Sequence, residues 1–166
     1  MKTILTILIL LLPILSKEKP IKTTIWYQKQ TTTIYNVLSF IKSHENPRYT
    51  GKIHNDGNGN KTIGFGHLLL KSDTFTYLDS TGANKLLSID FNKARDRCLN
   101  LYPTLNYSQH LAICHIIYAL GEGRALKLVK NGFLDTVKLK TFIKVNKKDH
   151  SLLIKQRNFE IKLFYE

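Results

Sequence analysis

The strongest restriction on the fold of this chain is the order of groups in residues 41–70, which read IKSHENPRYTGKIHNDGNGNKTIGFGHLLL. Helical periodicity stops before Pro47, because the residue before a proline disfavours helical geometry. Residues 48–53 and 61–65 are rich in strand formers and flank a turn of asparagine, aspartate and glycine, which predicts a β-hairpin. The segment therefore predicts a helix whose last turn delivers Glu45 to the edge of a small hairpin.

The rest of the sequence is mainly helical in pattern. Helices are predicted over residues 83–101, over 108–120 with Ser108 as the N-cap, in shorter pieces from Lys127, and over 152–165. The apolar run LAICHIIYAL favours a central, buried helix. We expect an α+β fold that is mainly helical, with a small β-hairpin subdomain carrying an active-site cleft.

Chain length and the opening segment predict the domain organisation. A chain of 166 residues suits one domain with a proper core. The opening MKTILTILILLLPILS is typical of a secretory signal, and its apolar run is shorter than the roughly 20 residues that cross a bilayer. We predict a signal peptide over 1–16 cleaved near Ser16, a flexible basic tether over 17–33 and one domain over 34–166. An exported protein, periplasmic or secreted, is expected.

Positive charge dominates the composition, with 25 Lys and Arg against 12 Asp and Glu and a formal net charge of +13. For an exported chain this favours an anionic cell-wall polymer or membrane surface as partner over nucleic acid. A solvated lysine surface without a partner is the other interpretation, since the lysines are scattered through residues 127–162. Both interpretations stay open, and we expect a monomer.

Three residues form a candidate catalytic set. Glu45 lies four residues past Ile41 on the apolar helix face, where partial desolvation disfavours the charged form and suits a proton donor. Asp56 and Thr62 would steer a water or stabilise positive charge on a sugar. Taken singly, each has an ordinary explanation: a solvated helix end, a turn former and a strand residue.

The same residues fit a metal site less well than they fit a catalytic site. Asp56, Asn58 and Asn60 alternate like the first ligands of a calcium loop, but Lys61 and His67 occupy the positions that need glycine and a bidentate glutamate. Histidines for a zinc site, namely His44, His54 and His67, follow no recognisable motif. We predict no metal and no organic cofactor.

A cysteine amidase or peptidase would use Cys98 or Cys114 with a histidine. The apolar surroundings of Cys114 favour core packing instead, and neither cysteine opens a helix after a loop as an activated thiol usually does. A disulfide between the two and a pair of buried thiols are both compatible with the sequence.

Residues 62–68 read TIGFGHL and follow Asp56 after five intervening residues. With Glu45, this order resembles the phage-type lysozymes, the endolysins of glycoside hydrolase family 24, whose signature is a helix-end Glu, an Asp-bearing turn and Thr-Ile-Gly-Tyr-Gly-His. The resemblance covers residues 36–166. Weaker similarities lie in residues 109–112, in residues 118–121 and in a closing helix with Arg157, Glu160, Leu163 and Phe164.

This resemblance implies a muramidase that cleaves the β-1,4 bond between N-acetylmuramic acid and N-acetylglucosamine in bacterial peptidoglycan. Glu45 would be the general acid, and Asp56 with Thr62 would hold the attacking water or support an oxocarbenium-like transition state. Substrate contacts are expected from Tyr49, Phe65, His67 and Arg157. Arg157 would either reach Glu45 or be an ordinary surface residue.

Three departures from the family pattern bear on activity. Ten residues separate Glu45 from Asp56, a longer interval than the family usually has, so His54 or Asn55 could take the role of the aspartate. Leu120 stands where the family commonly has asparagine, and residues 122–151 form a shorter stretch than in many relatives. The alternative function is a catalytically inactive lysozyme fold that binds cell wall or membrane through its basic surface.

Overall fold

The computed structural model describes residues 34–45, 49–56, 59–145 and 148–166. The predicted signal peptide (1–16) and tether (17–33) lie outside the described residues. Within the described ranges, no helix is both long enough and apolar enough to cross a membrane.

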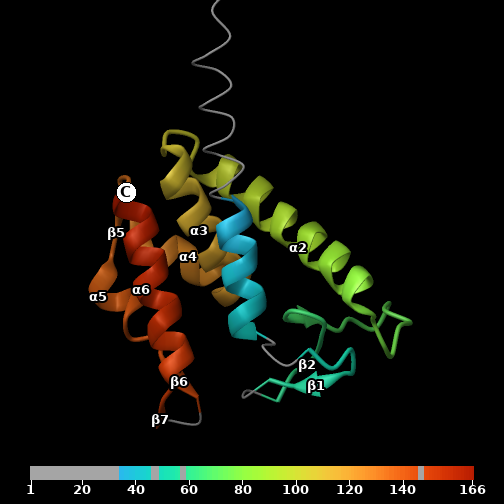
Figure 1. Cartoon of the computed structure of the whole chain (residues 1–166). Coiled ribbons are helices and arrows are strands. Elements are labelled where there is room, and N and C mark those ends of the chain that lie inside the picture. Colours follow the sequence, from blue (N-terminus) through green and yellow to red (C-terminus); the bar gives the residue numbers. More distant parts are fainter. Residues whose placement is uncertain (1–33, 46–48, 57–58, 146–147) are drawn as a thin grey trace, which may run out of the picture. The chain divides into compact units, whose positions relative to one another are not determined.

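The described part is mainly helical with small antiparallel sheets, which confirms the expected fold class (Figure 1). Residues 34–45 are helical. A three-stranded sheet follows, with β1 (His54–Asn55), β2 (Lys61–Ile63) and β3 (His67–Leu68) in that order. The longer helices are α2 (Ser80–Leu101), α3 (Tyr107–Leu120) and α6 (Ser151–Tyr165), and the shorter elements are α4 (Glu122–Leu128), β4 (Val129–Lys130), β5 (Phe133–Leu134), α5 (Thr136–Leu139), β6 (Lys144–Val145) and β7 (Lys148–Asp149).

Helix α3 forms the centre of the core, as its apolar run predicts. Every residue from Leu111 to Ile117 is buried, and α3 packs against both α2 and α6 (Figure 1). The helix over residues 34–45 joins this core through Val37 and Ile41. Phe40 on the same helix stacks on Phe159 of α6, with ring centroids 4.0 Å apart. This packing places the end of the helix, and so Glu45, at the edge of the core.

The hairpin differs from the prediction, which placed the first strand over residues 48–53; the structure describes residues 49–53 of this range. The observed partner of β2 on that side is β1, with His54 opposite Thr62. Gly51 turns instead toward the loop before α2: its φ is +69°, its carbonyl accepts from Leu78 N at 2.9 Å, and a Cβ there would lie 2.4 Å from the Leu78 carbonyl oxygen. This docking against the loop shortens the first strand.

Two small hairpins after α4 stand where short helical pieces were predicted from Lys127, so this part of the prediction is wrong. The first joins β4 to β5 through Asn131 and Gly132, whose φ angles are +51° and +78°. Asn-Gly is the residue pair that a tight two-residue turn favours, so the sequence did carry a signal for it. The second hairpin pairs β6 with β7.

Two helices begin before their predicted positions. The N-cap of α3 is Asn106, whose side chain accepts from Gln109 N at 2.9 Å, while the Gln109 side chain accepts from Asn106 N at 3.0 Å. This is a capping box, and it replaces the predicted cap at Ser108. Likewise α2 begins at Ser80, because Asp79 caps it by accepting from Gly82 N at 2.6 Å.

Replacing Asn106 with alanine should lower the free energy of unfolding by about 1 kcal/mol, because α3 would lose its N-cap acceptor. Urea denaturation followed by circular dichroism measures the change. Ser108→Ala is the matched control and should cost clearly less. A larger loss for Ser108→Ala would contradict Asn106 as the cap.

Candidate active site

A cleft of about 570 Å³ opens where the end of the helix over residues 34–45 meets the hairpin sheet, α3 and α6. The three predicted catalytic residues, Glu45, Asp56 and Thr62, all line it. They come from a helix end, the turn after β1 and the central strand β2. Tertiary packing therefore brings together the groups that the sequence predicts as one set.

Glu45 is half-buried, and its two carboxylate oxygens have different surroundings. Oε1 accepts a hydrogen bond of 2.9 Å from Nε2 of Gln156. Oε2 lies on the side of Gly66, where a Cβ would be 3.4 Å from this oxygen and from the Tyr118 hydroxyl. Gly66 has a φ of +97°, so any other residue there would be strained.

Asp56 both shapes its turn and lines the cleft. Its Oδ1 accepts from the backbone N–H of Asn60 at 2.8 Å, and its Oδ2 accepts from the Asn60 side chain at 2.9 Å. Asp56 therefore does stabilise its turn, as the ordinary explanation for this residue expects. Because the same carboxylate borders the cleft, the two roles do not exclude each other.

Thr62 is buried, with 7% of its surface exposed, although it borders the cleft. Its hydroxyl donates to the carbonyl of His54 at 3.3 Å, across the β1–β2 pair. This contact holds the hydroxyl between the strand and the cleft, where it can also accept a hydrogen bond.

The structure places Tyr49 and Phe65, two of the predicted substrate contacts, away from the cleft lining. The Tyr49 hydroxyl donates to the carbonyls of Leu78 and Asp79, and burial raises the pKa of Tyr49. Phe65 belongs to the core, and its carbonyl accepts from the Tyr118 hydroxyl. Both residues support the hairpin by packing, with their rings 5.2 Å apart.

Arg157 lines the cleft and is buried, so the interpretation as an ordinary surface residue is wrong. Only 1% of its surface is exposed. Nη1 lies 3.2 Å from Oε2 of Glu160, and Nη2 donates to Oε1 of Gln156 at 3.2 Å. Glu160 in turn accepts from Nδ1 of His115 at 2.6 Å. Burial lowers the pKa of Arg157, and the charges of Glu160 and Glu45 oppose this effect.

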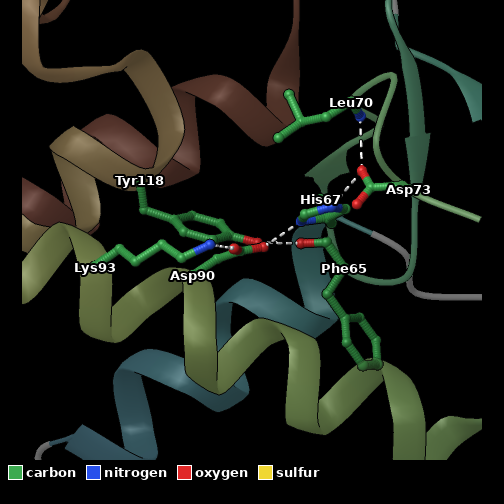
Figure 2. A network of polar contacts seen from close by, with 7 residues as sticks. All are labelled: Phe65, His67, Leu70, Asp73, Asp90, Lys93 and Tyr118. Atoms are coloured by element: carbon green, nitrogen blue, oxygen red, sulfur yellow. Dashed lines mark hydrogen bonds and ion pairs between the residues drawn. The ribbon is translucent and has the colours of Figure 1, made fainter.

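His67 is held between two carboxylates outside the main cleft (Figure 2). Nδ1 lies 2.6 Å from Asp90 of α2, and Nε2 lies 3.3 Å from Asp73 of the loop after β3. Asp73 also accepts from Leu70 N at 2.6 Å. His67 therefore ties the hairpin sheet to α2, and it borders a second, shallower pocket of about 340 Å³.

The two cysteines are buried free thiols. A hydrogen bond with Cys98, together with burial, raises the pKa of Cys114 far above its ordinary value. A thiol of this kind stays protonated near neutral pH and makes a poor nucleophile. In the described ranges, no group of three or more His, Cys, Asp or Glu side chains is arranged to hold a metal ion.

Comparison with known protein families matches residues 44–160 to phage lysozyme. The chain belongs to the phage lysozyme family. Among solved structures it is similar to the muramidase domain of SpmX from Asticaccaulis excentricus, with 20% sequence identity, a TM-score of 0.60, and coverage of 79% of this chain and 95% of that one. At this identity the match shows the fold. No curated protein matches the chain.

The cleft is also lined by residues of α3, α4, β6 and α6, and sequence patterns do not single out Gln156, Arg124 or Lys144 among them. Gln156 and Tyr118 lie beside Glu45, and Arg124 and Lys144 border the same cleft. Gln156, Arg124 and Lys144 lie in helices or short strands whose sequence carries no recognisable motif. Only their position at the cleft in the folded chain identifies them as site residues.

The contact between Asp73 and its partners should make stability depend on pH. The pKa of Asp73 is lowered from 3.8, chiefly because Leu70 N–H donates to the carboxylate, and His67 adds to this effect. A carboxyl with a lowered pKa contributes stability above its unfolded-state pKa and loses it as pH falls through the folded-state value.

Asp73→Asn should therefore be less stable than the wild type near neutral pH, and the difference should shrink as pH falls below 3.8. The measurement is the urea midpoint across this range. Asp96→Asn, which changes an exposed aspartate of α2, is the control and should show no such convergence. A constant difference for Asp73→Asn at every pH would contradict the ionic contribution.

Proposed function

We propose that this protein is a glycoside hydrolase, a muramidase that hydrolyses the β-1,4 bond between N-acetylmuramic acid and N-acetylglucosamine in peptidoglycan. The observation that carries the proposal is the meeting of Glu45, Asp56 and Thr62 at one cleft. Glycoside hydrolysis commonly uses two carboxyl groups that flank the scissile bond. Membership of the phage lysozyme family supports the same reaction.

Glu45 is the general acid in this proposal. Its Oε1 accepts from the neutral amide of Gln156, and its Oε2 lies beside Gly66 in the cleft lining. Delivery of the Glu45 proton to the leaving oxygen contributes about a hundred- to ten-thousand-fold in rate.

In this proposal, Asp56 and Thr62 act on the face of the sugar opposite the general acid Glu45. Asp56 either directs the attacking water or supports the positive charge that develops on the sugar, and Thr62 positions the water through its hydroxyl. The stereochemistry of the product tests the first role: inversion indicates direct attack by water, whereas retention indicates a covalent glycosyl-enzyme intermediate that water then hydrolyses.

The long interval between Glu45 and Asp56 does not remove Asp56 from the cleft. Gly51 accepts a backbone hydrogen bond from Leu78, and Lys52 forms an isolated β-bridge with Tyr77. This part of the interval therefore lies against the loop before α2. Asp56 still borders the same cleft as Glu45. This arrangement favours catalysis over the alternative of an inactive wall-binding protein.

The charge and the leader suggest where the enzyme works. A net charge of +13 would attract it to peptide carboxylates and anionic polymers of the wall and raise the encounter rate, an effect that salt screens. The leader over residues 1–16 would direct export to the compartment that holds this substrate.

Glu45→Gln should lower the rate of peptidoglycan hydrolysis by about a hundred- to ten-thousand-fold, because the amide cannot supply a proton. Mass spectrometry of the soluble products should find disaccharide-peptides with a muramic acid reducing end for the wild type and far fewer for the variant. Glu166→Gln, at an exposed carboxylate beside Lys162, is the control and should act like the wild type. Equal activity of the Glu45 variant would exclude Glu45 as the acid.

Asp56→Asn separates the two roles of this residue. Asparagine can still accept from Asn60 N–H and form the turn, but it carries no charge. We expect a loss of activity on the order of a hundredfold with the fold retained, measured as product release and thermal melting. Asp135→Asn, at an aspartate that caps α5 away from the cleft, is the control. Wild-type activity of Asp56→Asn would reduce Asp56 to a turn former.

A further inference from the structure

Gln156 is a buried amide in direct contact with the proposed acid. It lies on α6 with 3% of its surface exposed, and it borders the cleft. Its Nε2 donates to Oε1 of Glu45 at 2.9 Å, although the two residues are 111 positions apart in the chain. The side chain is therefore held at the reacting group by the fold itself.

The orientation of this amide is dictated by Arg157. A guanidinium group only donates, so the oxygen of the Gln156 amide must face Arg157 and the nitrogen must face Glu45. Arg157 is held in turn by Glu160 at 3.2 Å, and Glu160 by His115 at 2.6 Å. All three of these side chains are buried, so the amide is unable to turn over without breaking a buried contact.

We infer that Gln156 is the positioning residue that presents a neutral hydrogen-bond donor to Glu45 and thereby sets the pH range in which Glu45 holds its proton; this rests on the proposed function of Glu45. A donor on Oε1 leaves Oε2, on the side of Gly66, as the oxygen that carries the proton. A cation in place of the amide would favour the ionised carboxylate, and a carboxylate in its place would favour the protonated form.

Other ionisable groups also face Glu45, and none of them is itself replaced when only Gln156 is changed. Arg157 of α6 acts on it by charge, and burial keeps the Tyr118 hydroxyl of α3 neutral by raising the pKa of Tyr118. The remaining ionisable groups that border the cleft are His44, His54, Asp56, Arg124, Lys144 and His150. A difference between Gln156 variants therefore reports on position 156.

The test compares Gln156→Glu and Gln156→Lys in the full chain. Activity on peptidoglycan is measured as a function of pH, because the upper limb of the profile reports loss of the proton from the acid. We expect this limb to move to higher pH for Gln156→Glu and to lower pH for Gln156→Lys, each by on the order of one pH unit. Gln156→Glu keeps an acceptor for Arg157, so it remains informative if Gln156→Lys fails to fold.

Asn158→Asp and Asn158→Lys are the matched controls. Asn158 is an exposed amide two residues further along α6, and the same changes of charge there should leave the profile in place. Shifts in opposite directions for the Gln156 variants alone support the inference. Unchanged profiles, or equal shifts in the Asn158 variants, overturn it and leave Gln156 a packing residue.

Failure of the proposed function can be told apart from failure of this inference. If the wild type releases no product, the muramidase proposal fails, and the Glu45 carboxyl is then titrated directly by carbon NMR, with its signal assigned from its absence in Glu45→Gln. Opposite shifts of that titration in the two Gln156 variants still support the coupling. Identical titration curves in wild type and variants overturn it.

Discussion

The burial of α3 against α2 and α6 is the interaction on which the rest of the structure depends. Seven consecutive residues of α3 are buried, and the helix over residues 34–45 packs onto the same core through Val37, Ile41 and the stack of Phe40 on Phe159. Removing this apolar surface from water provides the main driving force for the arrangement. This packing positions residues of the cleft. Glu45 comes from the helix over residues 34–45, Tyr118 comes from the last turns of α3, and both line the same cleft.

A buried polar chain then connects the core to the site. It runs from His115 in α3 through Glu160, Arg157 and Gln156 of α6 to Glu45. Charges that leave water pay a large desolvation cost, which only well-directed partners offset, so a buried pair of this kind is weak evidence for stability by itself. Here it orients an amide at the cleft. Outside the cleft, His67 plays a corresponding part by joining the hairpin sheet to α2 through Asp90.

Local signals predicted the elements well where the chain carries short-range instructions. The helical periodicity before Glu45, the strand formers of β2 and the apolar run of α3 each indicated the correct element type. An error arose where a distant partner decided the outcome: the segment around Gly51 docks on Leu78 and so does not extend β1. Tyr49 and Phe65 also have distant partners, which lie in the loop before α2 and in α3. The N-cap at Asn106 depends on no distant partner, because the capping box of Asn106 with Gln109 can be recognised in the sequence.

The sequence by itself determined the family, the fold class and the order of Glu45, Asp56 and Thr62, because these depend on residue types at short and regular spacing. Only the tertiary structure decided which groups meet. The contact of Gln156 with Glu45 spans 111 positions, and His67 lies between carboxylates of two other segments. Arg157 is buried beside Gln156 and Glu160, although the sequence also allowed a surface position. Local patterns do not encode such contacts, because they follow from how the helices pack and from which buried polar groups must satisfy one another.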